Sequence, residues 1–201
     1  MIIGPRYKKA RYLGAPVFRK TQTQKYALRV QRKVKIGKHR SNKSEYGRQM
    51  LEKQKARFSY GVSGRQFTNY VNAALAASGD NAKNLLRLLE SRLDNVMVRA
   101  GFAPTRSAAR QMVSHGHIRV NGTVVTIPSF AVTAGDIISI REGSKTKAIF
   151  GKLDDDLRAA KFPNWLTVDA GSHEIKITGE PALDMTELLF DIRQVLEFYT
   201  R

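Results

Sequence analysis

The sequence predicts an α+β protein: an all-helical domain, a small module of helices packed on an antiparallel sheet, and a basic irregular N-terminal arm. Three observations lead to this prediction. Positive charge is concentrated toward the N-terminus, apolar residues recur with helical spacing from Ser44 to about Phe102, and hairpin-forming residues follow from Asn121 onward.

Composition limits the class of protein. The chain has 201 residues, enough for one or two domains with a real core, and its 42% hydrophobic content excludes disorder overall. No apolar run approaches a membrane span, and the N-terminus lacks the apolar stretch of a secretory signal. Cysteine is absent, which excludes disulfides and thiolate metal sites. The net charge of +18 indicates a polyanionic partner, either nucleic acid or an anionic membrane surface.

The positive charge is unevenly distributed along the chain. Residues 1–57 contain 18 Lys or Arg and two acids, and residues 1–43 contain no acid at all. Residues 58–152 carry a net charge of +7, whereas residues 153–201 carry −5. We therefore expect the polyanion to meet the N-terminal segment and the middle of the chain rather than its tail.

Residues 1–43 form the basic arm. The segment mixes Gly, Pro and basic residues with Tyr7, Tyr12, Phe18 and Tyr26, and it lacks helical periodicity. We expect it to be irregular and to become ordered on its partner, where basic groups neutralise phosphates and aromatic rings stack on unpaired bases. A solubilising tail and a membrane-binding segment are the alternatives. The lack of acids disfavours the first, and the lack of a broad apolar helix face disfavours the second.

Residues 44–90 form the predicted helical domain. Two helices are expected between Ser44, a plausible N-cap, and Ser78, with a break at the sequence GVSG. Basic residues border this break. They can be interpreted either as a solvated helix face or as a nucleic-acid contact. A third, longer helix is expected from Asp80 to Gly101, capped by Asp80 or Asn81.

Thr105 is the expected N-cap of the next helix. At about 100° per residue, its side chains divide into two faces. One face is cationic and hydrogen-bonding, and the other consists of small apolar residues that seat the helix. The first comprises Arg106, Ser107, Arg110, Gln111 and Ser114, and the second comprises Ala108, Ala109, Met112 and Val113.

The sheet is predicted from turn signals within residues 91–182. Asn121 and Gly122 separate two short apolar runs, which is a strong hairpin signal. A second strand pair is expected around the sequence TAGD, ending near Ile140, and Trp165 is expected to anchor this module as a buried aromatic.

Residues 183–201 are expected to form an amphipathic helix. We expect it to pack on the helices of residues 44–78 and so complete the helical domain; the alternative is a surface for a protein partner. Its apolar residues are Leu183, Leu188, Leu189, Ile192, Val195, Leu196 and Tyr199.

Several blocks of the sequence resemble one known family. SRLDNVMVRAGFAPTRSAARQMVSHGHIRVNG resembles the RNA-binding module named after small-subunit ribosomal protein four. SEYGRQMLEKQKARFSYGVSGRQFTNY and WLTVDAG are similar to the same ribosomal protein family, of bacterial or plastid type. The resemblance covers Ser44 to Arg201, and the early RYLG fits as well.

The resemblance implies a primary binder of 16S ribosomal RNA, within its 5′ domain, that folds a multi-helix junction early in subunit assembly. The RNA-binding residues that it implies in the module are Arg92, Thr105, Arg106, Arg110, Gln111, His115, Gly116 and Asn121. Those in the helical domain and the arm are Lys53, Lys55, Arg57, Tyr60, Gly61, Arg65, Gln66, Lys8, Lys9 and Arg11. Arginine forks clamp phosphates, and a helix N-terminus favours an anion.

The family also implies a position where messenger RNA enters the ribosome, next to small-subunit proteins three and five. Lys38, Arg40 and Lys43 would line the messenger path there. Contact with protein five is implied to influence decoding accuracy, and some members repress translation of their own operon. The implied location is the ribosome, in the bacterial cytoplasm or the plastid stroma.

We expect no cofactor. Many relatives fold the N-terminal segment around zinc held by cysteines, which this chain lacks, and His39 alone cannot replace them. His115 and His117 are not expected to bind a metal, and His115 is more simply interpreted as a residue that hydrogen-bonds RNA or the helix end. The run from Asp154 to Asp156 is more simply read as a helix first turn than as a divalent-cation site.

No catalytic motif is present, so we expect no enzyme activity. The rival assignments are an RNA-modifying enzyme that carries the same module and a DNA-binding regulator. The first lacks the chain length for a catalytic domain. The second fits poorly with a long aromatic and basic arm.

Overall fold

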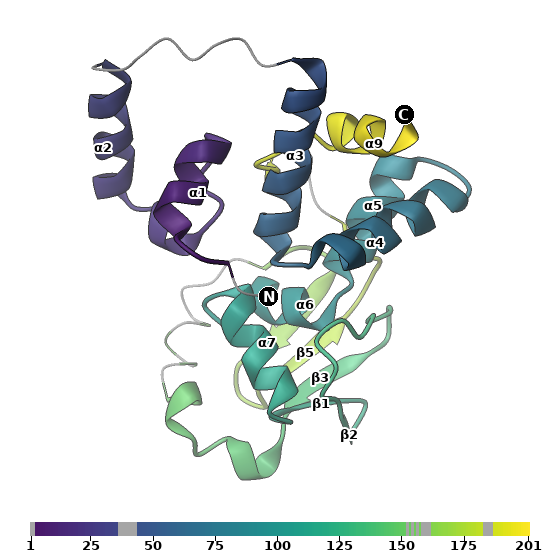
Figure 1. Cartoon of the computed structure of the whole chain (residues 1–201). Helices are drawn as coiled ribbons and strands as arrows, with labels where there is room; N and C mark the ends of the chain where they lie inside the picture. The colour runs from purple at the N-terminus through teal and green to yellow at the C-terminus, as the bar shows by residue number, and fades with distance from the viewer. Residues whose placement is uncertain are drawn as a thin grey trace. The chain divides into compact units, whose positions relative to one another are not determined.

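The computed structural model of the chain describes residues 3–35, 44–151, 153, 155, 157, 162–182 and 187–201. It confirms the α+β class, with helices and a five-stranded antiparallel sheet (Figure 1). The chain divides into two compact units. The first unit comprises Met1–Ala82 and Asp184–Arg201, and the second comprises Lys83–Leu183. Within the described residues, every helix is too short or too polar to cross a bilayer.

The described part of the basic arm is mostly helical, so the prediction of an irregular arm is wrong there. It contains α1 (Arg6–Leu13), the 3-10 helix η1 (Arg19–Thr21) and α2 (Gln24–Lys35). Ala10 and Leu13 of α1 are buried in an apolar cluster. The cluster also contains Val17 and Phe18, which follow α1, and Leu51 and Phe58, which belong to the helix Glu45–Tyr60. An eight-residue helix with two buried residues is too short to show helical periodicity in its apolar residues. It is stabilised by tertiary packing, which the sequence alone did not reveal.

The two helices expected after Ser44 are confirmed as α3 (Glu45–Tyr60) and α4 (Gly64–Ala76). The Ser44 hydroxyl accepts a hydrogen bond from the Gly47 N–H at 3.2 Å, as an N-cap does. Gly61 ends α3 with φ 64°, a left-handed conformation that favours glycine. The turn is short, since α4 begins at Gly64.

The C-terminal helix α9 (Ile192–Thr200) packs against α3 within the first unit (Figure 1). Glu197 accepts a hydrogen bond from the Gln49 side chain at 3.2 Å, and the Asp191 N–H donates one to Glu52 at 2.9 Å. The helix begins later than predicted because the Asp191 carboxylate caps it, accepting hydrogen bonds from the backbone N–H groups of Arg193 and Gln194. Leu188 and Leu189 precede it, and Leu183 lies outside the described residues.

The predicted single helix from Asp80 to Gly101 is wrong: it is two helices, α5 (Asn81–Glu90) and α6 (Leu93–Arg99). The break lies at Ser91 and Arg92, whose backbone pairs with the segment before the third strand. The Val132 N–H donates to the Ser91 carbonyl at 2.8 Å, and Arg92 forms a bridge with Ala131. Residues 129–132 therefore do not form the strand expected there.

The sheet of the second unit has the order β2-β1-β3-β5-β4, and all its pairs are antiparallel. The hairpin prediction is confirmed, because Asn121 (φ 50°) and Gly122 (φ 80°) both adopt positive φ between β1 and β2. The strands are β1 (Ile118–Val120), β2 (Thr123–Val124), β3 (Ile137–Ile140), β4 (Leu166–Asp169) and β5 (Glu174–Ile177).

One core joins the sheet to α6 and to the following helix α7 (Arg106–Ser114) (Figure 1). Met97, Ile118, Ile138 and Ile175 are fully buried in it, and Trp165 is 6% exposed, as expected for an anchoring aromatic. Two 3-10 helices, η2 (Glu142–Ser144) and η3 (Ala148–Phe150), follow β3. Asp155 is described as helical, whereas Asp154 and Asp156 lie outside the described residues.

Ile138 and Ile137 provide a matched test of this core, because they are neighbours on opposite faces of β3. Ile138 is fully buried, whereas Ile137 is 39% exposed. We expect Ile138→Ala to lower the free energy of unfolding of the second unit by about 2–5 kcal/mol. Ile137→Ala should lower it by less than about 1 kcal/mol. Urea unfolding followed by Trp165 fluorescence measures both, and equal effects would contradict this placement of the core.

Candidate nucleic-acid interface

Helix α7 presents its polar side chains away from the core. Ala109, Met112 and Val113 are buried, and Gln111 is exposed, as the helical periodicity predicted. The Thr105 hydroxyl accepts a hydrogen bond from the Ala108 N–H at 3.2 Å and so caps the helix. The packing of α7 on the sheet therefore fixes which side of the helix is available to a partner.

The arginines of α7 are held by residues from α6, and this was not predicted. The Asp94 side chain is 1% exposed and accepts hydrogen bonds from two guanidinium groups. Arg92 donates to it from Nε at 2.9 Å and Nη2 at 2.7 Å, and Arg110 donates from Nε at 3.1 Å. One buried carboxylate thus sets the position of an arginine on α7.

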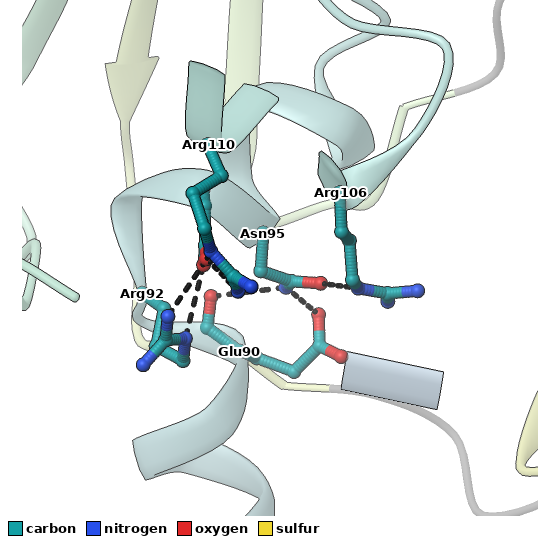
Figure 2. A network of polar contacts seen from close by, with 6 residues as sticks. Glu90, Arg92, Asn95, Arg106 and Arg110 are labelled. Carbon is teal, nitrogen blue, oxygen red and sulfur yellow. Dashed lines mark hydrogen bonds and ion pairs between the residues drawn. The ribbon is translucent and has the colours of Figure 1, made fainter. Parts of the chain in front are cut away.

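Glu90 is the second buried acid of the same network. Its carboxylate, 0% exposed, accepts hydrogen bonds from Asn95 Nδ2 at 2.7 Å and from Arg99 Nε at 2.9 Å. The Asn95 carbonyl oxygen in turn accepts from Arg106 Nε at 2.8 Å (Figure 2). Asn95 therefore links a buried acid to the first arginine of α7.

This cluster, which we call the arginine network, comprises Glu90, Arg92, Asp94, Asn95, Arg99, Arg106 and Arg110. It contains four guanidinium groups and two carboxylates, so it keeps a net charge of +2. The Arg110 side chain is 29% exposed, but that of Arg92 is only 3% exposed. Arg92, expected at the RNA surface, instead lies inside the module as a partner of Asp94.

The residues that sequence reasoning missed are Glu90, Asp94 and Asn95. Their only signal was two acids, four positions apart, in a stretch whose leucines recur with helical spacing. Acids in such a stretch are costly to bury unless they are paired. The pairing depends on the break at Ser91, which the periodicity of the sequence did not reveal.

The other expected module residues lie near the end of α7 and in the first hairpin. His115 is exposed at the end of α7, and Gly116 adopts φ 68°. Asn121 donates to Asp136 at 2.8 Å and accepts from the Ile137 N–H at 2.9 Å, so its amide holds the hairpin turn to β3. Burial raises the pKa of Asp136, but hydrogen bonds from the Thr133 backbone N–H, the Asn121 side chain and the Thr133 hydroxyl outweigh it and hold that pKa below its ordinary value.

His117 is buried, and its Nδ1 lies 3.0 Å from the Ser144 hydroxyl. Burial lowers the pKa of His117, and the nearby charges of Lys147, His115 and Arg141 lower it further. Among the described residues, no three His, Asp or Glu side chains gather in a way that could hold a metal ion.

In the first unit, the expected residues of the helical domain lie on α3, at the turn after it and at the start of α4. Lys55 is paired with Glu52 at 2.6 Å. Tyr60 is 2% exposed, so its ring packs internally, whereas Arg65 is exposed. Gln66 donates its backbone N–H to the Ser63 hydroxyl at 3.2 Å.

The expected arm residues Lys8 and Arg11 are exposed on α1, and Lys9 is partly buried. Lys38, Arg40 and Lys43, expected along the messenger path, and His39 lie outside the described residues. The expected residues that the structure describes thus divide between the two units.

Asp94 provides the most direct test of the arginine network. Asp94→Asn leaves Arg92 buried without its anion, and we expect it to lower the free energy of unfolding of the second unit by about 3–5 kcal/mol. Urea unfolding measures the change. Asp155→Asn, at an exposed position, should change stability by less than about 0.5 kcal/mol. An Asp94→Asn variant as stable as this control would contradict the network.

Two known families match consecutive parts of the chain. Residues 1–90 match the family described as ribosomal protein S4/S9 N-terminal domain, and residues 91–138 match the S4 domain.

Three relatives are each called small ribosomal subunit protein uS4. That of Chromobacterium violaceum is 44% identical over 207 residues, which cover 99% of this chain and 98% of the relative. That of Shewanella loihica is 40% identical over 204 residues, covering 99% and 98%. That of Borrelia hermsii is 43% identical over 163 residues, covering 81% and 78%.

These matches leave no support for the RNA-modifying enzyme or the DNA-binding regulator, because they run over nearly the whole chain and name ribosomal proteins. The chain belongs to the small ribosomal subunit protein uS4 family, a family of structural ribosomal proteins and not of enzymes.

Proposed function

We propose that this protein is a structural constituent of the small ribosomal subunit that binds 16S ribosomal RNA directly, within its 5′ domain. The observation that carries the proposal is the near full-length similarity to small ribosomal subunit proteins. The charge distribution supports it, since residues 1–57 have 18 basic residues and two acids.

In the second unit, Arg106 and Arg110 of α7 are the proposed phosphate contacts. Both are held by buried or network partners, and Arg110 stays partly exposed. A guanidinium that is already oriented loses less side-chain entropy when it binds a phosphate. Contacts of this kind recognise the shape and backbone of RNA, because the major groove of an A-form helix hides its base edges.

The finer roles follow from the family resemblance. The protein would fold a multi-helix junction early in assembly of the subunit body, next to proteins three and five. There it would lie near the point where messenger RNA enters and influence decoding accuracy. Repression of its own messenger would reuse the same RNA-binding residues. The proposed location is the ribosome, in the bacterial cytoplasm or the plastid stroma.

A salt titration of RNA binding tests the proposal. The wild type should bind the 5′ domain of 16S ribosomal RNA more tightly than it binds transfer RNA or duplex DNA. Arg106→Gln/Arg110→Gln should weaken binding and make the slope of log affinity against log salt shallower by about one to two, since each phosphate contact contributes roughly 0.7 to 0.9.

Lys176→Gln is the charge control, because Lys176 is exposed on β5. It should leave the affinity within about twofold of the wild type. Thermal melting would show that each variant is folded at the temperature of the binding assay. Equal affinity of the wild type for all three nucleic acids would overturn the proposed function.

A further inference from the structure

Among the described residues of the first unit, three cations lie on aromatic rings. Lys9 Nζ is 4.7 Å from the centroid of the Phe58 ring, and Arg57 Cζ is 4.5 Å from the same centroid. Lys53 Nζ is 3.9 Å from the centroid of the Phe198 ring. Since the face of an aromatic ring carries partial negative charge, each ring attracts the cation above it.

The rings and cations come from segments far apart in the sequence. Lys9 belongs to α1, Lys53 and Arg57 to α3, and Phe198 to α9. Arg57 is the common member: it shares a ring with Lys9, and it lies one helical turn from Lys53.

The rings of α9 are themselves held in place. The Tyr199 hydroxyl lies 3.2 Å from the Thr68 hydroxyl, and its ring centroid lies 5.7 Å from Lys53 Nζ. The Phe198 ring packs on Tyr46, with centroids 5.5 Å apart. A fixed ring confines the lysine above it to fewer rotamers than a lysine in water has.

No acid neutralises these cations within the described residues, where Lys9, Lys53 and Arg57 have no carboxylate in an ion pair. Burial lowers the pKa of Lys53, and the charge of Arg57 lowers it further. The neighbouring Lys55 differs, because it is paired with Glu52. Like charges one turn apart repel, and a bound anion relieves that repulsion.

We propose that Phe198 and Tyr199 of α9 are positioning residues for RNA binding: they hold Lys53 beside Arg57, and these two cations with Lys9 bind backbone phosphates of the ribosomal RNA as one site. This inference rests on the proposed function. It assigns the C-terminal helix, whose own segment is acidic, a part in RNA binding without any contact to RNA.

A double-mutant cycle on the full-length protein tests the inference, with affinities measured on the 5′ domain of 16S ribosomal RNA. Lys53→Gln should weaken binding about three- to tenfold and make the salt slope shallower by roughly one. Phe198→Leu keeps an apolar side chain but removes the ring, and it should weaken binding roughly two- to fivefold.

Two further variants complete the cycle. Phe198→Tyr keeps the ring and should bind like the wild type. The double variant Lys53→Gln/Phe198→Leu should bind like Lys53→Gln alone, because the ring acts through the lysine. Arg193→Gln removes an exposed charge from α9 and should stay within about twofold of the wild type.

The outcomes separate the inference from the proposed function. Wild-type affinity of Phe198→Leu, or additive losses in the double variant, would overturn the inference while ribosomal RNA binding stands. Weakened binding by Phe198→Tyr equal to that of Phe198→Leu would overturn it too, since the ring would then not be the active feature. A wild type without preference for the ribosomal fragment would overturn the proposed function.

Discussion

The buried carboxylates of Asp94 and Glu90 are the constraint on which the second unit depends. A carboxylate loses hydration when it is buried, and this cost is offset only by close partners. Here the partners are arginines and an asparagine. One of these arginines, Arg110, belongs to α7, and a second arginine of α7, Arg106, donates to the asparagine. The same contacts that compensate the acids therefore fix the polar face of the helix.

This arrangement also explains why the helical stretch breaks at Ser91 and Arg92. The extended backbone there pairs with Ala131 and Val132, so a separate helix, α6, starts after it with Asp94 in its first turn. A carboxylate in the first turn interacts favourably with the helix dipole. The break, the buried acid and the arginines of α7 are thus parts of one local structure.

The two units hold their cations by different means. In the second unit, acids position the arginines and neutralise half of their charge. In the first unit, aromatic rings lie beneath Lys9, Lys53 and Arg57, and a neutral ring does not neutralise the positive charge of these side chains. Both arrangements orient long side chains before any ligand arrives, which reduces the entropy lost on binding.

The sequence allowed prediction of those features that depend on local signals. The Ser44 cap, the turn at Gly61, the Asn121–Gly122 hairpin and the apolar seat of α7 follow from a few adjacent residues, and all are present.

The features that sequence reasoning missed depend on contacts between distant residues. Helix α1 is stabilised by packing on Leu51 and Phe58, and the break at Ser91 is stabilised by pairing with Val132. The candidate site shows the same limit. The basic residues were identifiable from the sequence, but their partners Asp94, Asn95 and Phe198 were not, because those contacts exist only in the folded chain.

Hydroxyl-radical footprinting of the protein, with and without the 5′ domain of 16S ribosomal RNA, tests the central claim most directly. The account predicts that RNA protects side chains on α7 and on α3 through the turn into α4, and leaves the outer face of β4 and β5 reactive. Protection confined to β4 and β5, with α3 and α7 unchanged, would contradict it.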